Sequence, residues 1–219
     1  MKKMNIFVVG ANGQIGRHLI QKLGTTEHQV YAGVRDVANQ AIYDEENIAY
    51  VPFDLTWSSE KMAEAFQESE LVIFAAGSQG KNLLQVDLDG AIKTMIAAEQ
   101  ANISRYLMIS AAFADNREKW PESMTDYYIT KYYADEWLKN QTSLDYVILQ
   151  PVALTNDDEV TSIQLTKPDE KPAQSITRKT VAEVLAALVD QPNITKTTVV
   201  LSEGSATVSD AIKQLVEEA

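Results

Sequence analysis

The chain of 219 residues has a formal net charge of −12 at pH 7, no cysteine and two histidines. The surplus of negative charge argues against nucleic acid or an anionic membrane as a partner, because phosphates would be repelled. The lack of cysteine excludes disulfides and thiol catalysis, and His18 and His28 do not have the spacing of zinc ligands. No stretch has the length of a membrane span or the pattern of a secretory signal. We therefore expect a cytoplasmic protein with one α/β domain and no metal site.

The first predicted strand, Ile6–Val9, leads into a turn with Gly10, Gly13 and Gly16 and then into a helical pattern. An apolar run without polar alternation is typical of a strand buried on both faces, as in a parallel sheet. Gly10 permits a tight turn, Gly13 lets a ligand approach the backbone, and Gly16 lets the helix pack against the strand. The first N–H groups of the helix could then bind a pyrophosphate. The alternative is a strand-to-helix turn that binds no ligand. The predicted cofactor contacts of this turn are Gly10, Asn12, Gly13, Gln14, Ile15 and Gly16.

The second predicted strand, Val30–Val34, is followed directly by Arg35 and Asp36. In a dinucleotide-binding unit this strand end lies near the adenosine ribose, where an arginine accommodates a 2′-phosphate and an acidic residue accepts from the 2′-hydroxyl. Arg35 therefore favours NADP(H), and Asp36 keeps NAD(H) possible. A solvated cation at the end of a strand is the alternative for Arg35.

Two further strands, Ile48–Phe53 and Leu71–Ala75, also end in candidate cofactor residues. Asp54, with Leu55 beside it, is placed to contact an adenine amino group or, alternatively, to cap a turn. Small residues after the fourth strand would leave room for a cofactor across the strand ends. These small residues are Ala75, Ala76 and Gly77. A long helix is predicted from Leu83 to Gln100.

The fifth predicted strand, Tyr106–Ile109, has Ser110 at its end, and a polar loop from Ala114 to Asp126 follows. The next predicted helix, Thr125–Lys139, carries Tyr127 and Lys131 four residues apart and hence on one face. That face also holds small and apolar residues suited to packing on the sheet. We expect Tyr127 and Lys131 to point toward the strand ends.

The remaining sequence continues the alternation of strands and helices. A sixth strand is predicted at Asp145–Leu149, residues 152–175 are expected to be loop-rich, and Thr197–Leu201 forms a last strand. This alternation predicts a Rossmann-type, doubly wound, predominantly parallel sheet with helices on both faces, in one domain spanning residues 1–219. We expect residues 151–219 to form a small substrate-side portion, and the first and fourth strands to be neighbours.

These features resemble the atypical short-chain dehydrogenase/reductases, especially the small NAD(P)H-binding type that includes biliverdin-IXβ (flavin) reductase and nitrogen-regulator-like proteins. The residues that carry the resemblance are Gly10-Ala-Asn-Gly13-Gln-Ile-Gly16, Gly33-Val-Arg35-Asp36, Asp54, Ala75-Ala-Gly77, Val86-Asp-Leu-Asp-Gly90, Ser110-Ala111, Tyr127-x-x-x-Lys131, Leu144-Asp-Tyr-Val-Ile-Leu-Gln-Pro151 and Leu154-Thr155. The resemblance implies that Pro151, Val152 and Lys131 also contact the cofactor. The chain differs at Gln150-Pro151-Val152, where relatives commonly read Arg-Pro-Gly.

The resemblance implies catalysis by Tyr127, Lys131 and Ser110. Tyr127 would donate a proton, Lys131 would orient the ribose, and Ser110 would hold a carbonyl oxygen. A free tyrosine has a pKa near 10, which the Lys131 ammonium and the oxidised nicotinamide would lower. The alternative is structural, since tyrosines crowd this helix and Lys131 could pair with Asp135 four residues on.

Three functions follow in order of preference. The first is an NADP(H)-dependent oxidoreductase that transfers hydride to a small carbonyl or a flavin- or tetrapyrrole-like acceptor. The second is a non-enzymatic NADP-binding redox sensor that reports to a protein partner. The third, a nucleotide-sugar epimerase, usually needs a larger C-terminal region than residues 151–219 provide, and fold alone does not decide among them.

Overall fold

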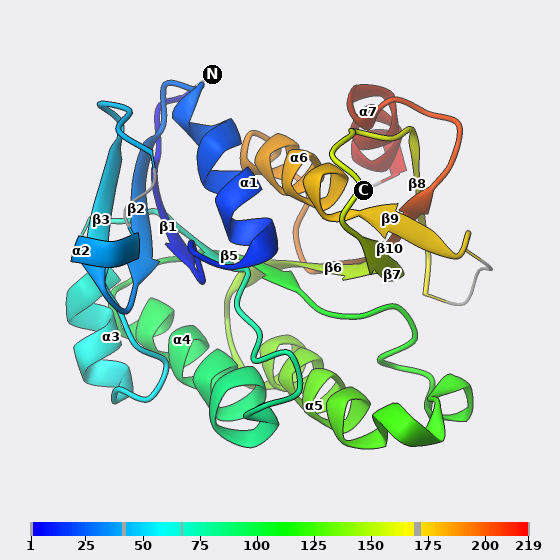
Figure 1. The fold of residues 1–219 in the computed structure, drawn as a ribbon, viewed down its shortest axis with the longest axis horizontal. Helices are drawn as coiled ribbons and strands as arrows, with labels where there is room; N and C mark the ends of the chain where they lie inside the picture. The colour runs from blue at the N-terminus through cyan, green and yellow to red at the C-terminus, as the bar shows by residue number, and fades with distance from the viewer. Residues whose placement is uncertain (1, 41–42, 67, 169–171, 219) are drawn as a thin grey trace.

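The apolar runs of the sequence become the strands of an eight-stranded sheet and of a separate two-stranded sheet (Figure 1). The computed structural model describes residues 2–40, 43–66, 68–168 and 172–218. The strands are β1 (Asn5–Val9), β2 (Gln29–Val34), β3 (Ile48–Pro52), β4 (Leu71–Phe74), β5 (Arg105–Ile109), β6 (Asp145–Pro151), β7 (Ala153–Thr155), β8 (Ile163–Thr166), β9 (Ser175–Thr177) and β10 (Thr197–Glu203).

The large sheet has the order β3-β2-β1-β4-β5-β6-β10-β8. Its pairs are parallel except that β8 runs antiparallel to β10. The predicted adjacency of the first and fourth strands is confirmed, since Ile6 of β1 pairs with Leu71 of β4. The strand order reverses between these two strands, which is where open parallel sheets form a ligand crevice at their carboxyl edge.

Helices cover both faces of the sheet. They are α1 (Gln14–Gly24), α2 (Val37–Gln40), α3 (Ser59–Phe66), α4 (Asp89–Gln100), α5 (Thr125–Gln141), α6 (Arg178–Val189) and α7 (Val208–Glu218). One face carries α1 and α6, with α7 packed against α6, and the other carries α3, α4 and α5 (Figure 1). The fold is therefore the single Rossmann-like α/β domain that the alternation predicts.

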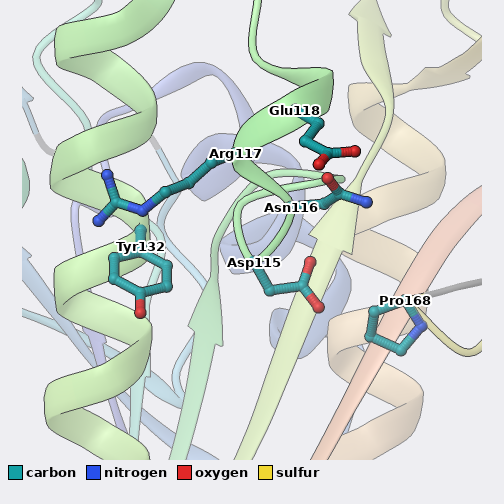
Figure 2. A pocket seen from close by; sticks show the side chains of 6 residues that line it. All are labelled: Asp115, Asn116, Arg117, Glu118, Tyr132 and Pro168. Carbon is teal, nitrogen blue, oxygen red and sulfur yellow. The ribbon is translucent and has the colours of Figure 1, made fainter.

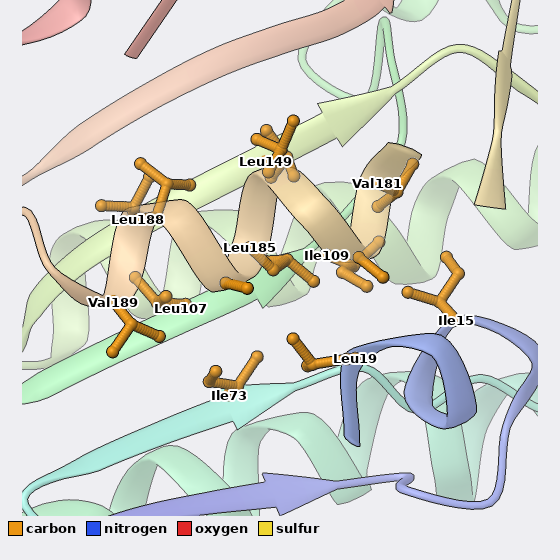
Figure 3. Close-up of a cluster of buried hydrophobic side chains, with 14 of the residues drawn as sticks. Ile15, Leu19, Ile73, Leu107, Ile109, Leu149, Val181, Leu185, Leu188 and Val189 are labelled. Carbon is orange, nitrogen blue, oxygen red and sulfur yellow. The ribbon is translucent and has the colours of Figure 1, made fainter. Parts of the chain in front are cut away.

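The core is divided by the sheet into two layers because successive strand residues point to opposite faces. In β1, Ile6 and Val8 join the layer under α1 and α6, whereas Phe7 and Val9 join the layer over α3 and α4. Figure 3 shows the first layer, in which Leu19 of α1 and neighbouring aliphatic side chains of α6 meet the sheet. Burying each such side chain stabilises the fold by about 1.5–3 kcal/mol, so the strands on which the site stands are firmly held.

Two parts of the prediction need correction. The long helix starts as a π-helix, Leu83–Leu88, before the regular α4 begins. The segment expected to be loop-rich holds β7 and β8, with β9 at its end, and β7 pairs with β9 in the two-stranded sheet. These strands are three or four residues long, and their partners lie far along the chain, so local pattern carries little signal of them. Across the described residues, every helix is too short or too polar to span a bilayer.

Candidate nucleotide cleft and active site

The glycine turn is pressed against the end of β4. Gly10 has a φ of +82°, which side chains rarely tolerate, and a Cβ there would lie 2.7 Å from the Cα of Ala76. The amide of Gly13 donates to the carbonyl oxygen of Gly10 over 2.9 Å. At Gly16 a Cβ would overlap that same oxygen. The three glycines therefore let the turn, the start of α1 and the end of β4 come together, as the spacing predicts.

The start of α1 is available to an anion. Gly13 precedes it in an extended conformation, and within the described part of the chain no side chain caps this helix end. Its first N–H groups therefore keep their donor capacity and the positive end of the helix dipole. Asn12 and Gln14 flank Gly13 at the turn, while Ile15 is buried in the core.

Sequence reasoning missed one residue of this turn. The exposed Arg17 donates from Nε to the backbone oxygen of Asn12 over 3.1 Å and to its Oδ1 over 2.9 Å. This contact holds a guanidinium beside the glycine turn. The available signal was a cation directly after the glycine triplet.

Arg35 and Asp54 act on each other at the ends of β2 and β3. Arg35 is exposed, and its charge acts on the Asp54 carboxylate. Burial opposes ionisation of Asp54, but hydrogen bonds from Thr56 and the charges of Arg35 and Lys93 give it a lowered pKa. Asp54 Oδ1 accepts from the Thr56 amide and hydroxyl over 2.8 Å each, so it caps a turn as one alternative expected. Its contact to adenine stays a prediction.

The segment after β4 is held by a buried carboxylate. Asp87 is 2% exposed, and its Oδ1 and Oδ2 accept from the Ser78 amide over 3.2 and 3.0 Å. Ala75 and Ala76 are partly buried there, and Gly77 is exposed. Asp87 was not among the predicted site residues, although it stands in the Val86–Gly90 motif of the resemblance. The predicted cofactor residue Leu55 packs against Gly90, which lies three residues after Asp87.

The ends of β5 and β6 are joined beside Ser110. The Pro151 carbonyl oxygen accepts from the Ala112 amide over 2.9 Å, and the Val152 amide donates to Leu201 over 3.1 Å. Pro151 and Val152 are both buried, and their backbone groups are used in these hydrogen bonds. Their predicted contact with a cofactor stays untested.

Ser110 contacts a buried acid. It is 3% exposed and donates from Oγ to Asp135 Oδ2 over 2.8 Å, and Gln150 Nε2 donates to the same oxygen over 3.1 Å. Burial raises the pKa of Asp135 to about 6, against the opposing effects of Ser110, Gln150 and the nearby lysines. Sequence reasoning considered Asp135 only as a partner of Lys131 and did not place Gln150 in this cluster.

Lys131 points to the end of β5 as predicted. It is 6% exposed, and Nζ donates to the Ile109 carbonyl oxygen over 3.3 Å. Burial lowers the Lys131 pKa, while the carboxylates of Asp87 and Asp135 act to raise it. The ammonium therefore bonds to the residue before Ser110 and feels the negative charges of Asp87 and Asp135.

Tyr127 lies near this ammonium, with 5.8 Å between Lys131 Nζ and the centroid of its ring. Its pKa differs from the expectation, because burial and then the negative charges of Asp87 and Asp135 raise it to about 12. Burial is the largest of these causes, and both carboxylates act in the same direction. The phenol consequently keeps its proton over the whole neutral range.

A pocket of about 510 Å³ is lined by the loop that follows β5, by one residue of α5 and by Pro168 (Figure 2). Its lining residues are Asp115, Asn116, Arg117, Glu118, Tyr132 and Pro168. The Arg117 guanidinium carbon is 4.6 Å from the centroid of Tyr132 and 4.8 Å from that of Trp120. Sequence reasoning expected a loop over the site here but named none of these lining residues as functional.

Comparison with known proteins identifies the family. The pattern that defines the NAD(P)H-binding family matches residues 10–192. A protein of Bacillus subtilis (strain 168), described as the uncharacterized sugar epimerase YhfK, is 36% identical over 97% of this chain and 100% of its own length. The crystal structure of the oxidoreductase ylbE from Lactococcus lactis has a TM-score of 0.91 at 35% identity and covers 98% of this chain and 97% of its own.

A more distant structure shares the fold. It is a short-chain dehydrogenase/reductase from Veillonella parvula in complex with NADP, with a TM-score of 0.78, 19% identity, and coverage of 94% of this chain and 97% of its own. The family match spans both the glycine turn and the Tyr127–Lys131 pair. The chain belongs to the NAD(P)H-binding family of proteins that are similar to the atypical short-chain dehydrogenase/reductases.

Proposed function

We propose that this protein is an NADP(H)-dependent reductase that transfers hydride to a small carbonyl or to a flavin- or tetrapyrrole-like acceptor. The observation that carries the proposal is the position of Lys131, whose ammonium meets the residue before Ser110 at the carboxyl end of β5. Tyr127 lies beside this ammonium. The Tyr127 phenol, the Lys131 ammonium and the Ser110 hydroxyl thus lie at the edge of the sheet where a dinucleotide binds in this fold.

The residues present fit a dinucleotide. Added Cβ atoms at Gly10 and Gly16 would fill the turn, and the uncapped start of α1 offers N–H donors to a pyrophosphate. When bound, NADPH supplies a hydride. Lys131 would hold the ribose and offset the charge that Tyr127 acquires on giving up its proton.

The raised pKa of Tyr127 means that the phenol carries the proton that a donor needs. A phenol with a pKa of about 12 is fully protonated at neutral pH and serves as the proton donor to the acceptor oxygen. The proton lost must be replaced from solvent or a neighbouring group after each turnover.

A panel of acceptors tests this function. NADPH consumption should be followed with quinones, flavins and small carbonyls, and steady turnover of at least one of them is expected. Tight NADPH binding without turnover of any would instead support the redox sensor, whose partner would then be another protein. The name of the Bacillus subtilis relative makes an epimerase the third candidate. An epimerase would interconvert nucleotide sugars with no net NADPH consumption.

Arg35 should decide between the two dinucleotides. Its exposed guanidinium at the end of β2 is placed to make charge-assisted hydrogen bonds to a 2′-phosphate. Such bonds contribute about 1.5–3 kcal/mol each. Arg35→Ala should therefore weaken NADPH binding by roughly ten- to a hundredfold and leave NADH binding unchanged, as measured by titration calorimetry.

Two controls accompany this titration. Arg35→Lys keeps the charge but loses the paired hydrogen-bond geometry, so its affinity for NADPH should lie between those of wild type and Arg35→Ala. Asp36→Ala should leave NADPH binding intact. Equal affinities of the wild type for NADPH and NADH would refute the preference and make Asp36 the better candidate for a ribose contact.

A further inference from the structure

The buried contacts of Ser110 conflict with a simple role as a hydrogen-bond donor to substrate. Ser110, Asp135 and Gln150 come from the end of β5, from α5 and from β6, and each is at most 3% exposed. Asp135 Oδ2 accepts from both of the other two side chains. The hydroxyl proton of Ser110 is therefore directed at Asp135 and away from any acceptor molecule.

This direction matters because a serine hydroxyl has only one proton. When that proton is donated to Asp135, the Ser110 oxygen can only accept hydrogen bonds. A carbonyl oxygen can also only accept. In this arrangement Ser110 cannot hold the carbonyl oxygen of a substrate.

The same cluster contains unused acceptors. Asp135 Oδ1 and Gln150 Oε1 are both buried, and neither has a hydrogen-bond partner among the described residues. A buried carboxylate with one unpaired oxygen costs free energy, and protonation lowers that cost because it removes the charge. A proton on Oδ2 would reverse the bond, because the acid would then donate to Ser110 Oγ while still accepting from Gln150.

We propose that Asp135 is a positioning residue that sets the direction of the Ser110 hydrogen bond and thereby controls carbonyl binding. The ionised acid accepts the Ser110 hydrogen bond, so the hydroxyl proton is not available to the substrate. The protonated acid donates to Ser110 and frees the serine proton for the substrate. This inference rests on the proposed reductase function, in which Ser110 meets the carbonyl oxygen of the acceptor.

The pH at which Asp135 changes its protonation state depends on burial and on the groups around it. Groups facing it are Ser110 from β5, Gln150 from β6, and Lys131 and Lys139 from α5 itself. From the π-helix, Asp87 acts on Lys131 and Tyr127. On α4, Lys93 and Asp89 pair with each other over 2.8 Å.

Burial outweighs these charges and holds the pKa of Asp135 at about 6. The protonated fraction grows as pH falls through that value. Reduction of a carbonyl acceptor, which depends on Ser110, should therefore also become faster as pH falls.

Kinetics provide the first test. For a carbonyl acceptor, wild-type kcat/KM should rise as pH falls through about 6 and then reach a plateau. Asp135→Asn is uncharged and can donate from Nδ2 to Ser110 Oγ when the Gln150 amide turns so that its Oε1 accepts the second Nδ2 proton. Its profile should therefore be flat, with a value at pH 8 about tenfold or more above wild type. Gln150→Leu removes a donor to the carboxylate and should move the wild-type rise to higher pH. Asp126→Asn, an exposed change of the same kind on α5, should leave the profile unchanged.

A titration that needs no turnover provides the second test. The carboxyl carbon of Asp135 can be followed by carbon-13 NMR with labelled aspartate, and Asp135→Asn assigns its signal. The carboxyl should titrate near pH 6, and in Ser110→Ala it should titrate at still higher pH because the ionised form loses a donor.

The two tests separate the two proposals. A carboxyl that titrates near its ordinary value, or whose pKa is unmoved in Ser110→Ala, overturns the switch. So does an Asp135→Asn variant that folds, binds NADPH and loses activity at every pH, since the carboxylate would then act as an anion. A wild-type protein that reduces no acceptor refutes the reductase function instead, and the titration alone then decides whether Asp135 controls Ser110.

Discussion

Replacing Tyr127 by phenylalanine should preserve NADPH binding and lower turnover of a carbonyl acceptor by at least about a hundredfold. The reason is that the variant keeps the ring beside Lys131 and removes only the hydroxyl group that carries the proton. Proton transfer from a positioned side chain typically contributes about 10²–10⁴-fold to the rate. The measurement is kcat and KM for one acceptor, together with the dissociation constant of NADPH.

Tyr128→Phe is the matched control. Tyr128 is the next residue on α5, but its ring stacks on Trp120 with 5.7 Å between centroids, so its hydroxyl should have no part in the reaction. Lys131→Ala should impair both NADPH binding and turnover, because Lys131 is proposed to hold the ribose and to offset the charge on Tyr127. If Tyr127→Phe reduces a flavin-like acceptor as fast as wild type, the proton comes from solvent or substrate. The protein would then position the two reactants for direct hydride transfer.

Gly16→Ala should remove nucleotide binding and destabilise the fold by about 3 kcal/mol or more, at the upper end of overpacking effects. Its new Cβ would overlap the Gly10 carbonyl oxygen and lie 2.9 Å from the carbonyl carbon of Ala11. Both neighbours are backbone atoms, which cannot rotate away as a side chain can. The start of α1 must therefore move from the end of β1, and the pyrophosphate site moves with it.

Gly24→Ala on the same helix separates this clash from the general effect of adding a methyl group. There the nearest atoms are the Cδ1 of Ile48 at 3.0 Å and the Cγ of Glu45 at 3.3 Å, the ends of side chains that can shift. Its stability should stay within about 1 kcal/mol of wild type, since alanine also favours the helix. Urea unfolding of the two variants measures the difference. Equal stabilities would show that α1 is not locked to the turn.

Most of the fold is determined by local sequence. Apolar runs such as Ile6–Val9 contain no polar residue, so they are stable only between two layers of helices, and this requirement predicts a parallel sheet. The glycine spacing predicts the turn into α1 because the strand, the turn and the helix are consecutive in the chain. The short strands β7, β8 and β9 escaped prediction because pairing with distant segments, and not local composition, creates them.

The candidate site was only partly predictable, for the same reason. Helical spacing places Tyr127 and Lys131 on one face, and the strand end places Ser110 near them. The surroundings of these groups depend on Asp87 and Asp135, which only the packing of the π-helix and α5 brings to the same cluster. A pKa reflects the total field of nearby charges and the loss of water around the group. The sequence alone therefore determined that Tyr127, Lys131 and Ser110 lie at the strand ends, whereas the tertiary structure added Asp87 and Asp135, raised the pKa of Tyr127 and bonded Ser110 to Asp135.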